Sequence, residues 1–244
     1  PASEHTVRAL RESTRAFPAE QTTVLFLGDN IYPAGMPPEG HKDRHHAEEI
    51  LGGQVELLAD FGGQLLYLPG NHDWNEGRAD GLEWVQREDA WFDRHRTGNV
   101  LRPDDGCPGP EVLRLAEGLV LVILDSQWWL EQHKYPEGIN PDCTHTDKQL
   151  WLKGVEAVLA EHSDETVVVA AHHPLYSNGE HGGRYPVTDH LFPFRKAHKA
   201  LWIPLPVLGS IYPIARKAGV AIQDIPHTAY SNLRDSLTAV LATH

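Results

Sequence analysis

The sequence predicts an α/β fold in which largely parallel strands are flanked by helices, in a chain of 244 residues. Two observations lead to this prediction. Short apolar, β-branched runs alternate along the chain with longer stretches of mixed apolar and charged residues, and these are typical of strands and surface helices respectively. Three of the apolar runs also lead directly into loops that carry polar and charged side chains.

The strands are predicted from short, continuously apolar runs. The three runs that precede polar loops span residues 23–27, 64–68 and 165–171. Runs of this length and composition are typical of strands that are buried on both faces of a sheet. A further pair of runs, at residues 111–116 and 119–124, predicts a β-hairpin around an intervening Glu-Gly turn.

Helices are expected between and after these strands. In the helix predicted at residues 146–161, Thr146 is a candidate N-cap, with Gln149 three positions later as its capping-box partner. The alternation of strand and helix predicts a mainly parallel sheet, in which ligands gather beyond the carboxyl ends of the strands. The predicted helices span residues 8–17, 46–61, 81–95, 146–161 and 231–242.

The end of the chain differs in character from the rest. Residues 1–184 are expected to form the core domain, and residues 185–244 an insertion or a lid-like segment. Within the latter, residues 201–213 are apolar but interrupted by three prolines, so no simple helix or strand is predicted there. This stretch fits a lid over a site, a contact surface, or an irregular insertion that packs into the core.

Charge and hydropathy exclude some classes of function. Asp and Glu total 34 against 21 Lys and Arg, which gives a net charge of −13 and argues against broad nucleic-acid binding. A small phosphorylated ligand remains compatible with this charge, because a bound metal ion can supply local positive charge. No apolar run approaches the roughly 18 residues of a transmembrane helix, so no membrane span is predicted.

The chain has two cysteines, Cys107 and Cys143, and both lie in loop sequences rich in Pro and Gly. Such a pair suits a disulfide bond and an oxidising compartment, and it is equally compatible with two free thiols. On this basis we suspect an extracytoplasmic location, periplasmic or secreted, while a cytoplasmic one stays open.

The polar loops contain the motifs G-D-N-I-Y at residues 28–32, G-N-H-D at 70–73 and H-H-P at 172–174. Their side chains offer a carboxylate (Asp29), an amide oxygen (Asn71), an imidazole (His172) and a phenol (Tyr32). These are the donors that a two-metal phosphoesterase site requires, where paired ions neutralise phosphate oxygens and activate water. Since all three loops follow strand ends, we expect the donors to converge.

In this order, the three motifs resemble those of the calcineurin-like metallophosphoesterases, over roughly residues 23–183. Tyr32 in G-D-N-x-Y and the Glu-His-Gly sequence around His181 resemble the purple acid phosphatase branch of that family. The resemblance implies a metallophosphatase-type β-sandwich flanked by helices, with mixed, largely parallel sheets. It also implies a dinuclear metal site that hydrolyses phosphate monoesters in phosphorylated small molecules.

The resemblance assigns a role to each matching residue. Asp29 would bridge the two ions, and Tyr32 would complete the first ion's site. Asn71 and His172 would bind the second ion, and the resemblance alone favours His172 over its neighbour His173. The ions would be Fe, Zn or Mn, with Tyr32 suggesting Fe³⁺ for one site.

Three further residues receive roles from the same resemblance. His72 and His181 would face the substrate, where each would bind phosphate or give a proton to the leaving group. Asp73 would orient a neighbouring group from behind the ligands.

Two motifs of the family have no counterpart in this sequence: an aspartate at the end of an earlier strand, and G-H-x-H after His181. The first ion is then left with Asp29 and Tyr32, and the second with Asp29, Asn71 and His172. A stable catalytic site normally has about three protein ligands plus water. We therefore expect the chain to bind the second ion weakly and the first hardly at all, and to be a fragment, or the ordered part, of a longer enzyme.

Two other functions remain open at this point. A phosphodiesterase or nucleotide hydrolase would share the same core site, because the loops around the site select the substrate. A non-catalytic binding module would keep the fold without the missing motifs. The sequence leaves the oligomeric state open.

Overall fold

The computed structural model describes residues 4–95, 99–131, 140, 142–195, 198, 200–205 and 207–244. The chain divides into two compact units, which are described separately below. Unit 1 comprises Pro1–His173 together with His244, and unit 2 comprises Pro174–Thr243. The expected domain division after residue 184 stays a prediction.

Unit 1 contains two small β-sheets. In the first, β1 (Thr23–Phe26) pairs in parallel with β2 (Gln64–Tyr67). The second has the strand order β3 (Glu111–Ala116), β4 (Leu119–Ile123), β5 (Thr166–Ala170), with β3 antiparallel and β5 parallel to β4. Each predicted strand is confirmed to within one residue at either end.

A shared apolar core connects the two sheets. It consists of buried side chains from both of them, with Leu66 and Leu68 on one side and Leu121, Ile123 and Ala170 on the other. These residues come from the strands or immediately follow them, which is why the strands are continuously apolar. The result is a sandwich of mixed, largely parallel sheets, and the predicted fold class is confirmed.

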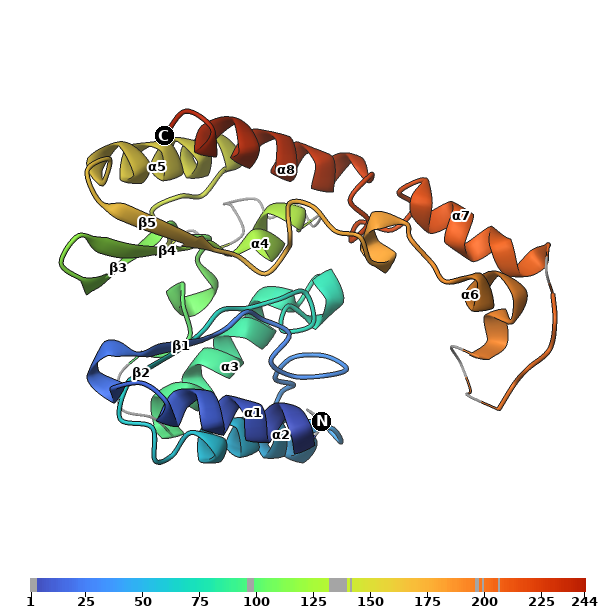
Figure 1. Ribbon diagram of the computed structural model, residues 1–244, viewed down its shortest axis with the longest axis horizontal. Coiled ribbons are helices and arrows are strands. Elements are labelled where there is room, and N and C mark those ends of the chain that lie inside the picture. Colours follow the sequence, from blue (N-terminus) through green and yellow to red (C-terminus); the bar gives the residue numbers. More distant parts are fainter. Residues whose placement is uncertain are drawn as a thin grey trace. The chain divides into compact units, whose positions relative to one another are not determined.

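The helices of unit 1 lie around these sheets (Figure 1). Arg11 in the first helix donates from Nε to the Leu57 carbonyl at the end of the second, 3.2 Å away. The ring of Phe92 in the third helix lies 4.5 Å from that of Tyr67 in β2. The helices are α1 (Glu4–Arg15), α2 (Arg44–Leu57), α3 (Gly81–His95), α4 (Ser126–Leu130) and α5 (Lys148–Glu161).

Two details of the predicted elements are wrong. β5 is not buried on both faces: Val168 at its centre is 45% exposed, and exposed residues alternate with less exposed ones along the strand, so one of its faces is left uncovered. The N-cap of α5 is Asp147 and not Thr146. The Asp147 carboxylate accepts hydrogen bonds from the backbone N–H groups of Gln149 and Leu150, at 2.8 and 2.9 Å.

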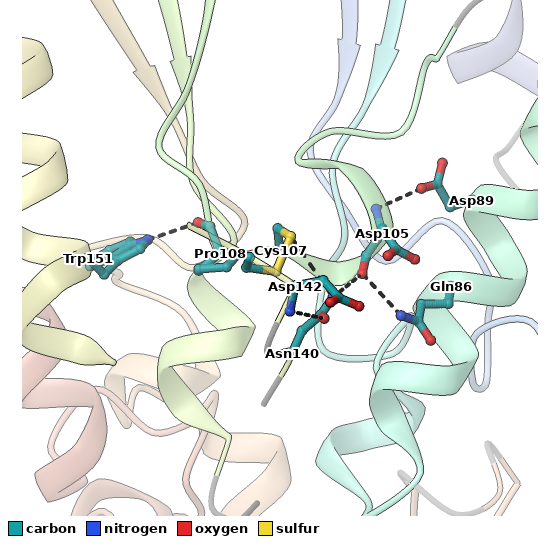
Figure 2. The surroundings of a disulfide bond; sticks show 9 residues. Gln86, Asp89, Asp105, Cys107, Pro108, Asn140, Asp142 and Trp151 are labelled. Carbon is teal, nitrogen blue, oxygen red and sulfur yellow. Dashed lines mark hydrogen bonds between the residues drawn. A yellow bond between two sulfur atoms is a disulfide. The ribbon is translucent and has the colours of Figure 1, made fainter. Parts of the chain in front are cut away.

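Cys107 and Cys143 form a disulfide bond, whose surroundings are shown in Figure 2. The bond joins residues 36 positions apart, and a loop of that size typically gains about 2–4 kcal/mol of stability from such a link. The carbonyl of the next residue, Pro108, accepts hydrogen bonds from Trp151 Nε1 (2.9 Å) and from the backbone N–H of Asp125 (3.0 Å). The disulfide is therefore adjacent in sequence to a carbonyl group that contacts both α5 and the N-cap residue of α4.

Unit 2 has helices and no strand within its described residues. No simple helix is predicted for residues 201–213, of which Pro206 lies outside the described part. This is wrong for the end of the stretch, which forms a 3₁₀ turn and the start of a helix. Nor does the stretch pack as core, since Trp202 is 55% and Val207 79% exposed. The main helices are α6 (Val187–Leu191), α7 (Ile211–Lys217) and α8 (Thr228–Leu241).

None of the helices in the described parts of the chain combines the length and the apolar character that crossing a membrane requires.

Candidate metal centre

The candidate site lies at the carboxyl ends of β1, β2 and β5, all within unit 1. The chain leaves β1 through Gly28 at φ +87° and Asp29 at φ +56°. A left-handed backbone is uncommon for a residue other than glycine, and such positions cluster at functional sites. This turn places the Asp29 carboxylate beside the end of β2.

Gly28 and Gly70 let the three strand ends approach one another. A Cβ atom on Gly28 would lie 2.6 Å from His172 Nδ1 and 2.7 Å from the backbone nitrogen of Gly70. A Cβ atom on Gly70 would lie 2.5 Å from the backbone nitrogen of Asp29 and 2.8 Å from His172 Cε1. Glycine is thus required at both positions by close backbone approach, in addition to the turn freedom expected from the sequence.

Three of the four predicted metal ligands converge here. His172 Nε2 lies 3.3 Å from Asp29 Oδ1 and 3.3 Å from Asn71 Oδ1. Donor atoms bonded at about 2.0–2.1 Å to a tetrahedral ion stand roughly this far apart. The spacing of the three donors is therefore compatible with one metal ion.

The hydrogen bond on the other side of the His172 ring supports this fit. His172 Nδ1 donates to the Leu27 carbonyl at 2.6 Å, which leaves Nε2 without a proton in the neutral ring. The lone pair of Nε2 then faces oxygen atoms of Asp29 and Asn71, which are also acceptors. A cation among the three resolves this repulsion, so these residues fit a metal ion.

Tyr32, the fourth predicted ligand, is held differently. Its hydroxyl donates to Asp29 Oδ2 at 2.6 Å, and its ring is about half exposed. Burial of the hydroxyl, together with its hydrogen bond to the Asp29 carboxylate, raises the pKa of Tyr32 above its ordinary value. Tyr32 is therefore a neutral hydrogen-bond donor in this arrangement. Among the described residues, Asp29 and Tyr32 are the two that are predicted for the first ion's site.

His72 lies next to these groups. Its ring packs 4.3 Å from that of Tyr32, and its Nδ1 donates to the Pro33 carbonyl at 2.5 Å. Its Nε2 is 3.9 Å from Asp29 Oδ2, and its backbone N–H donates to Asp29 Oδ1 at 3.1 Å. One backbone contact thus fixes the ring of His72 while its second nitrogen faces the candidate ligands.

The side chain of Asp73 connects the loop after β1 with the loop after β2. Its buried carboxylate accepts hydrogen bonds from the backbone N–H groups of Gly70 (2.7 Å), Asn30 (3.0 Å) and Ile31 (3.2 Å). Burial raises the pKa of Asp73 to about 6, against the lowering effect of these hydrogen bonds. Its contacts match the orienting role expected from the sequence, since both loops carry candidate ligands.

Sequence reasoning missed two buried partners of this network, Asn30 and Glu88. Asn30 Nδ2 donates to the Leu68 carbonyl at 3.0 Å and to Glu88 Oε1 at 3.1 Å. Glu88 is fully buried, and that burial raises its pKa well above the ordinary value. The available signal was its spacing, because Glu88 falls between Trp84 and Trp91 on the apolar stripe of α3.

The two adjacent histidines have different surroundings. His173 is buried, its Nδ1 lies 2.8 Å from Ser126 Oγ, and its backbone N–H donates to the same oxygen at 3.0 Å. His172 instead points its Nε2 toward Asp29 and Asn71.

His181 belongs to unit 2 and contacts other residues of that unit. Its Nδ1 lies 2.9 Å from the Gln223 carbonyl and 3.3 Å from a terminal nitrogen of Arg216. Its own carbonyl accepts from the backbone N–H of Ile225 at 2.9 Å.

In the parts of the chain that the structure describes, no group of three or more His, Cys, Asp or Glu side chains is placed to hold a metal ion. The donor set at the strand ends reaches three only because it includes the amide of Asn71.

Comparison with known proteins identifies the family. Residues 4–203, most of the chain, match the family model described as calcineurin-like phosphoesterase. No curated protein and no solved structure matched the chain. Proteins of this family hydrolyse phosphoester bonds of phosphorylated small substrates and generally bind divalent metal ions. The chain therefore belongs to the calcineurin-like phosphoesterase family.

Proposed function

We propose that this protein hydrolyses phosphate monoesters at a metal centre of the purple acid phosphatase type. Asp29, Asn71 and His172 would hold one ion, and Asp29 would share a second ion with Tyr32. The observation that carries the proposal is the convergence of three donor atoms at strand ends kept close by two glycines. His172 Nε2 lies 3.3 Å from Asp29 Oδ1 and 3.3 Å from Asn71 Oδ1.

The chemistry divides between the ions and the chain. When bound, the ions supply positive charge for the phosphate oxygens and make water a better nucleophile at neutral pH. His72 keeps one nitrogen on the Pro33 carbonyl and presents the other toward Asp29, where it can exchange a proton with an ester oxygen. The family resemblance also implies a substrate-binding role for His181, and we retain it as part of the proposal. Tyr32 and Asp73 hold the Asp29 loop in place.

The number of ions is tested by metal analysis of the purified chain after incubation with Fe, Zn²⁺ or Mn²⁺ and removal of the excess. One firmly held ion per chain, lost in Asn71→Ala, is expected from the three convergent donors. The ion at Asp29 and Tyr32 has only these two ligands, so we expect it to be held weakly. Retention of an ion by Asn71→Ala with undiminished affinity would contradict the assignment.

The reaction is tested with p-nitrophenyl phosphate and bis(p-nitrophenyl) phosphate under the same metal conditions. Faster hydrolysis of the monoester supports the proposal. Faster hydrolysis of the diester would replace it with a phosphodiesterase or nucleotide hydrolase. Firm metal binding without hydrolysis of either ester would favour a non-catalytic binding module.

We also propose an extracytoplasmic location. The support for it is the Cys107–Cys143 disulfide, because such bonds persist in oxidising compartments. Alkylation of the protein from its native cells, without and with prior reduction, tests the location. Labelling of the cysteines before reduction would contradict it.

A further inference from the structure

One segment of unit 2 carries its large apolar side chains on the outside. Val207, Leu208, Ile211 and Ile214 occur at positions i, i+1, i+4 and i+7 through a 3₁₀ turn and α7, so they share one face. Each of these four side chains is at least 60% exposed. Trp202, a few residues earlier, is also exposed. We call Val207, Leu208, Ile211 and Ile214 the apolar face, and Trp202 precedes it in the sequence.

The opposite side of the same segment packs inward with small or polar groups. Gly209 and Pro213 are buried, and a Cβ atom on Gly209 would run into the carbonyl oxygen of His190. Arg216 turns its guanidinium inward, donating from Nε to the fully buried Asp224 carboxylate at 2.5 Å. Helices at the surface of water-soluble proteins normally turn apolar side chains inward and polar side chains outward. The opposite orientation here fits a segment whose apolar face contacts apolar surroundings.

The charge of this region is opposite to that of the whole protein. Residues 184–220 contain six Lys or Arg residues and one acid, a net charge of +5, whereas the whole chain carries −13. One of the six, Arg216, is paired with Asp224 just outside this range, which leaves five basic residues against Asp189. Basic and apolar groups also meet directly, because the guanidinium carbon of Arg195 lies 4.0 Å from the centre of the Trp202 ring. Lys217 ends α7, immediately after Arg216.

We propose that the apolar face docks on a membrane surface containing anionic lipids. Exposed aliphatic and Trp side chains would enter the boundary between headgroups and acyl chains, and the neighbouring Lys and Arg side chains would contact anionic headgroups. Charges in physiological salt are screened beyond about 8 Å, so acidic side chains farther than this from the apolar face oppose docking little.

A second copy of the chain is the main competing occupant, and the charge argues against its simplest form. A symmetric dimer would bring the same +5 region from both copies together. Like charges facing each other across an interface are unfavourable, whereas an anionic membrane neutralises them.

The experiment is co-sedimentation of the full chain with lipid vesicles. Phosphatidylcholine vesicles that contain phosphatidylglycerol should bind the protein, and phosphatidylcholine alone should bind it much more weakly. Added salt should reduce the binding. Absence of binding, or equal binding to both kinds of vesicle, would overturn the proposal.

Variants locate the contact. Ile211→Asp combined with Ile214→Asp should weaken partitioning at least about tenfold, because two apolar side chains no longer leave water. Lys217→Glu, a surface change that leaves the apolar face intact, should weaken it about fivefold or more. The matched controls are Leu150→Asp and Lys153→Glu in α5 of unit 1, at exposed positions that should leave partitioning unchanged. Equal effects of the control and test variants would overturn the proposal.

Analytical ultracentrifugation without lipid separates the competing occupant. A monomer whose vesicle binding follows the variants as above supports the membrane. Self-association that the Ile211→Asp and Ile214→Asp changes abolish, without vesicle binding by the unchanged chain, would assign the apolar face to a second copy.

Discussion

The strand-end site of unit 1 and the apolar face of unit 2 arrange polar and apolar atoms in opposite ways. In the site, carboxylates such as Asp73 are buried and the backbones of Gly28 and Gly70 nearly touch neighbouring groups. On the apolar face, aliphatic side chains are exposed while the Asp224 carboxylate lies inside. Both arrangements are unusual for a folded chain.

The difference indicates where each region is constrained. A site that must hold Asp29 and Asn71 oxygens each 3.3 Å from His172 Nε2 depends on backbone approach and buried hydrogen bonds, so it should tolerate little change. An exposed face makes few contacts within its own chain. Substitutions there should alter binding to a partner and leave the stability of the chain nearly unchanged.

The largest expected effect is that of Gly70→Ala. The added methyl group would lie 2.5 Å from the Asp29 backbone nitrogen, so the ends of β1 and β2 would have to separate. We expect no measurable metal binding by calorimetry and a loss of roughly 4 kcal/mol or more in urea unfolding. The control is Gly52→Ala in α2, where the methyl group meets open space and should stabilise the helix by about 0.5–1 kcal/mol. Similar behaviour of the two variants would show that close approach does not constrain the site.

The adjacent histidines should separate binding from stability. His172→Ala removes a donor atom. Loss of a group that only orients a ligand already lowers metal affinity roughly 10–100-fold, so the loss of the ligand itself should lower it at least as much. The stability of the chain should change little. His173→Ala leaves the buried Ser126 hydroxyl short of a partner and should cost about 1–3 kcal/mol without loss of metal affinity. Calorimetric titration and urea unfolding measure the two effects. The opposite pattern would make His173 the ligand.

Asp125 should give unit 1 a stability that depends on pH. Burial raises the pKa of this carboxyl to about 7, although hydrogen bonds from Trp128, Trp74 and Gln127 lower it. Between pH 4 and 7, roughly, the folded chain keeps a proton that the unfolded chain has released, so stability falls as pH rises, by up to ~1.4 kcal/mol per pH unit. Asp125→Asn should reduce this slope in urea unfolding measured across the range, and the raised pKa values of Asp73 and Glu88 should account for the part that remains. An unchanged slope would assign it to other groups.

The smallest effect is expected on the apolar face. Val207→Ser exchanges a side chain that is already 79% exposed, so the unfolding free energy should change by less than about 0.5 kcal/mol. Urea unfolding in the absence of lipid measures it. A loss comparable to that of a core substitution would mean that Val207 packs within the chain, and it would weaken the contrast between the two regions.

The elements and motifs were predictable because their signals are local. The apolar runs give the strands to within one residue, since their length and β-branched composition leave few alternatives. G-D-N-I-Y and G-N-H-D identified loops whose side chains do converge. The cap of α5 was misplaced by one residue because Thr146 and Asp147 both suit that role, and only the backbone at Asp147 decides between them.

Other features depend on long-range contacts that leave little trace in the sequence. Glu88 resembles any charged helix residue until Asn30, 58 positions away, donates to it inside the core. The exposure of Val168 depends on which face of β5 other parts of the chain cover, and the apolar run itself does not indicate this. The apolar composition of residues 201–213 is compatible with a core insertion, but composition does not indicate which way a side chain faces.

The hydrogen bond from His172 Nδ1 to the Leu27 carbonyl joins residues 145 positions apart. An unfolded chain cannot present this oriented imidazole next to Asp29, so a cation that fits the three donors should bind almost only to the folded protein. Its binding free energy then adds to the stability, by about 2.7 kcal/mol at a free concentration 100 times the dissociation constant. The shift in melting temperature thus ranks Fe, Zn²⁺ and Mn²⁺ by their fit to this site before any substrate is known.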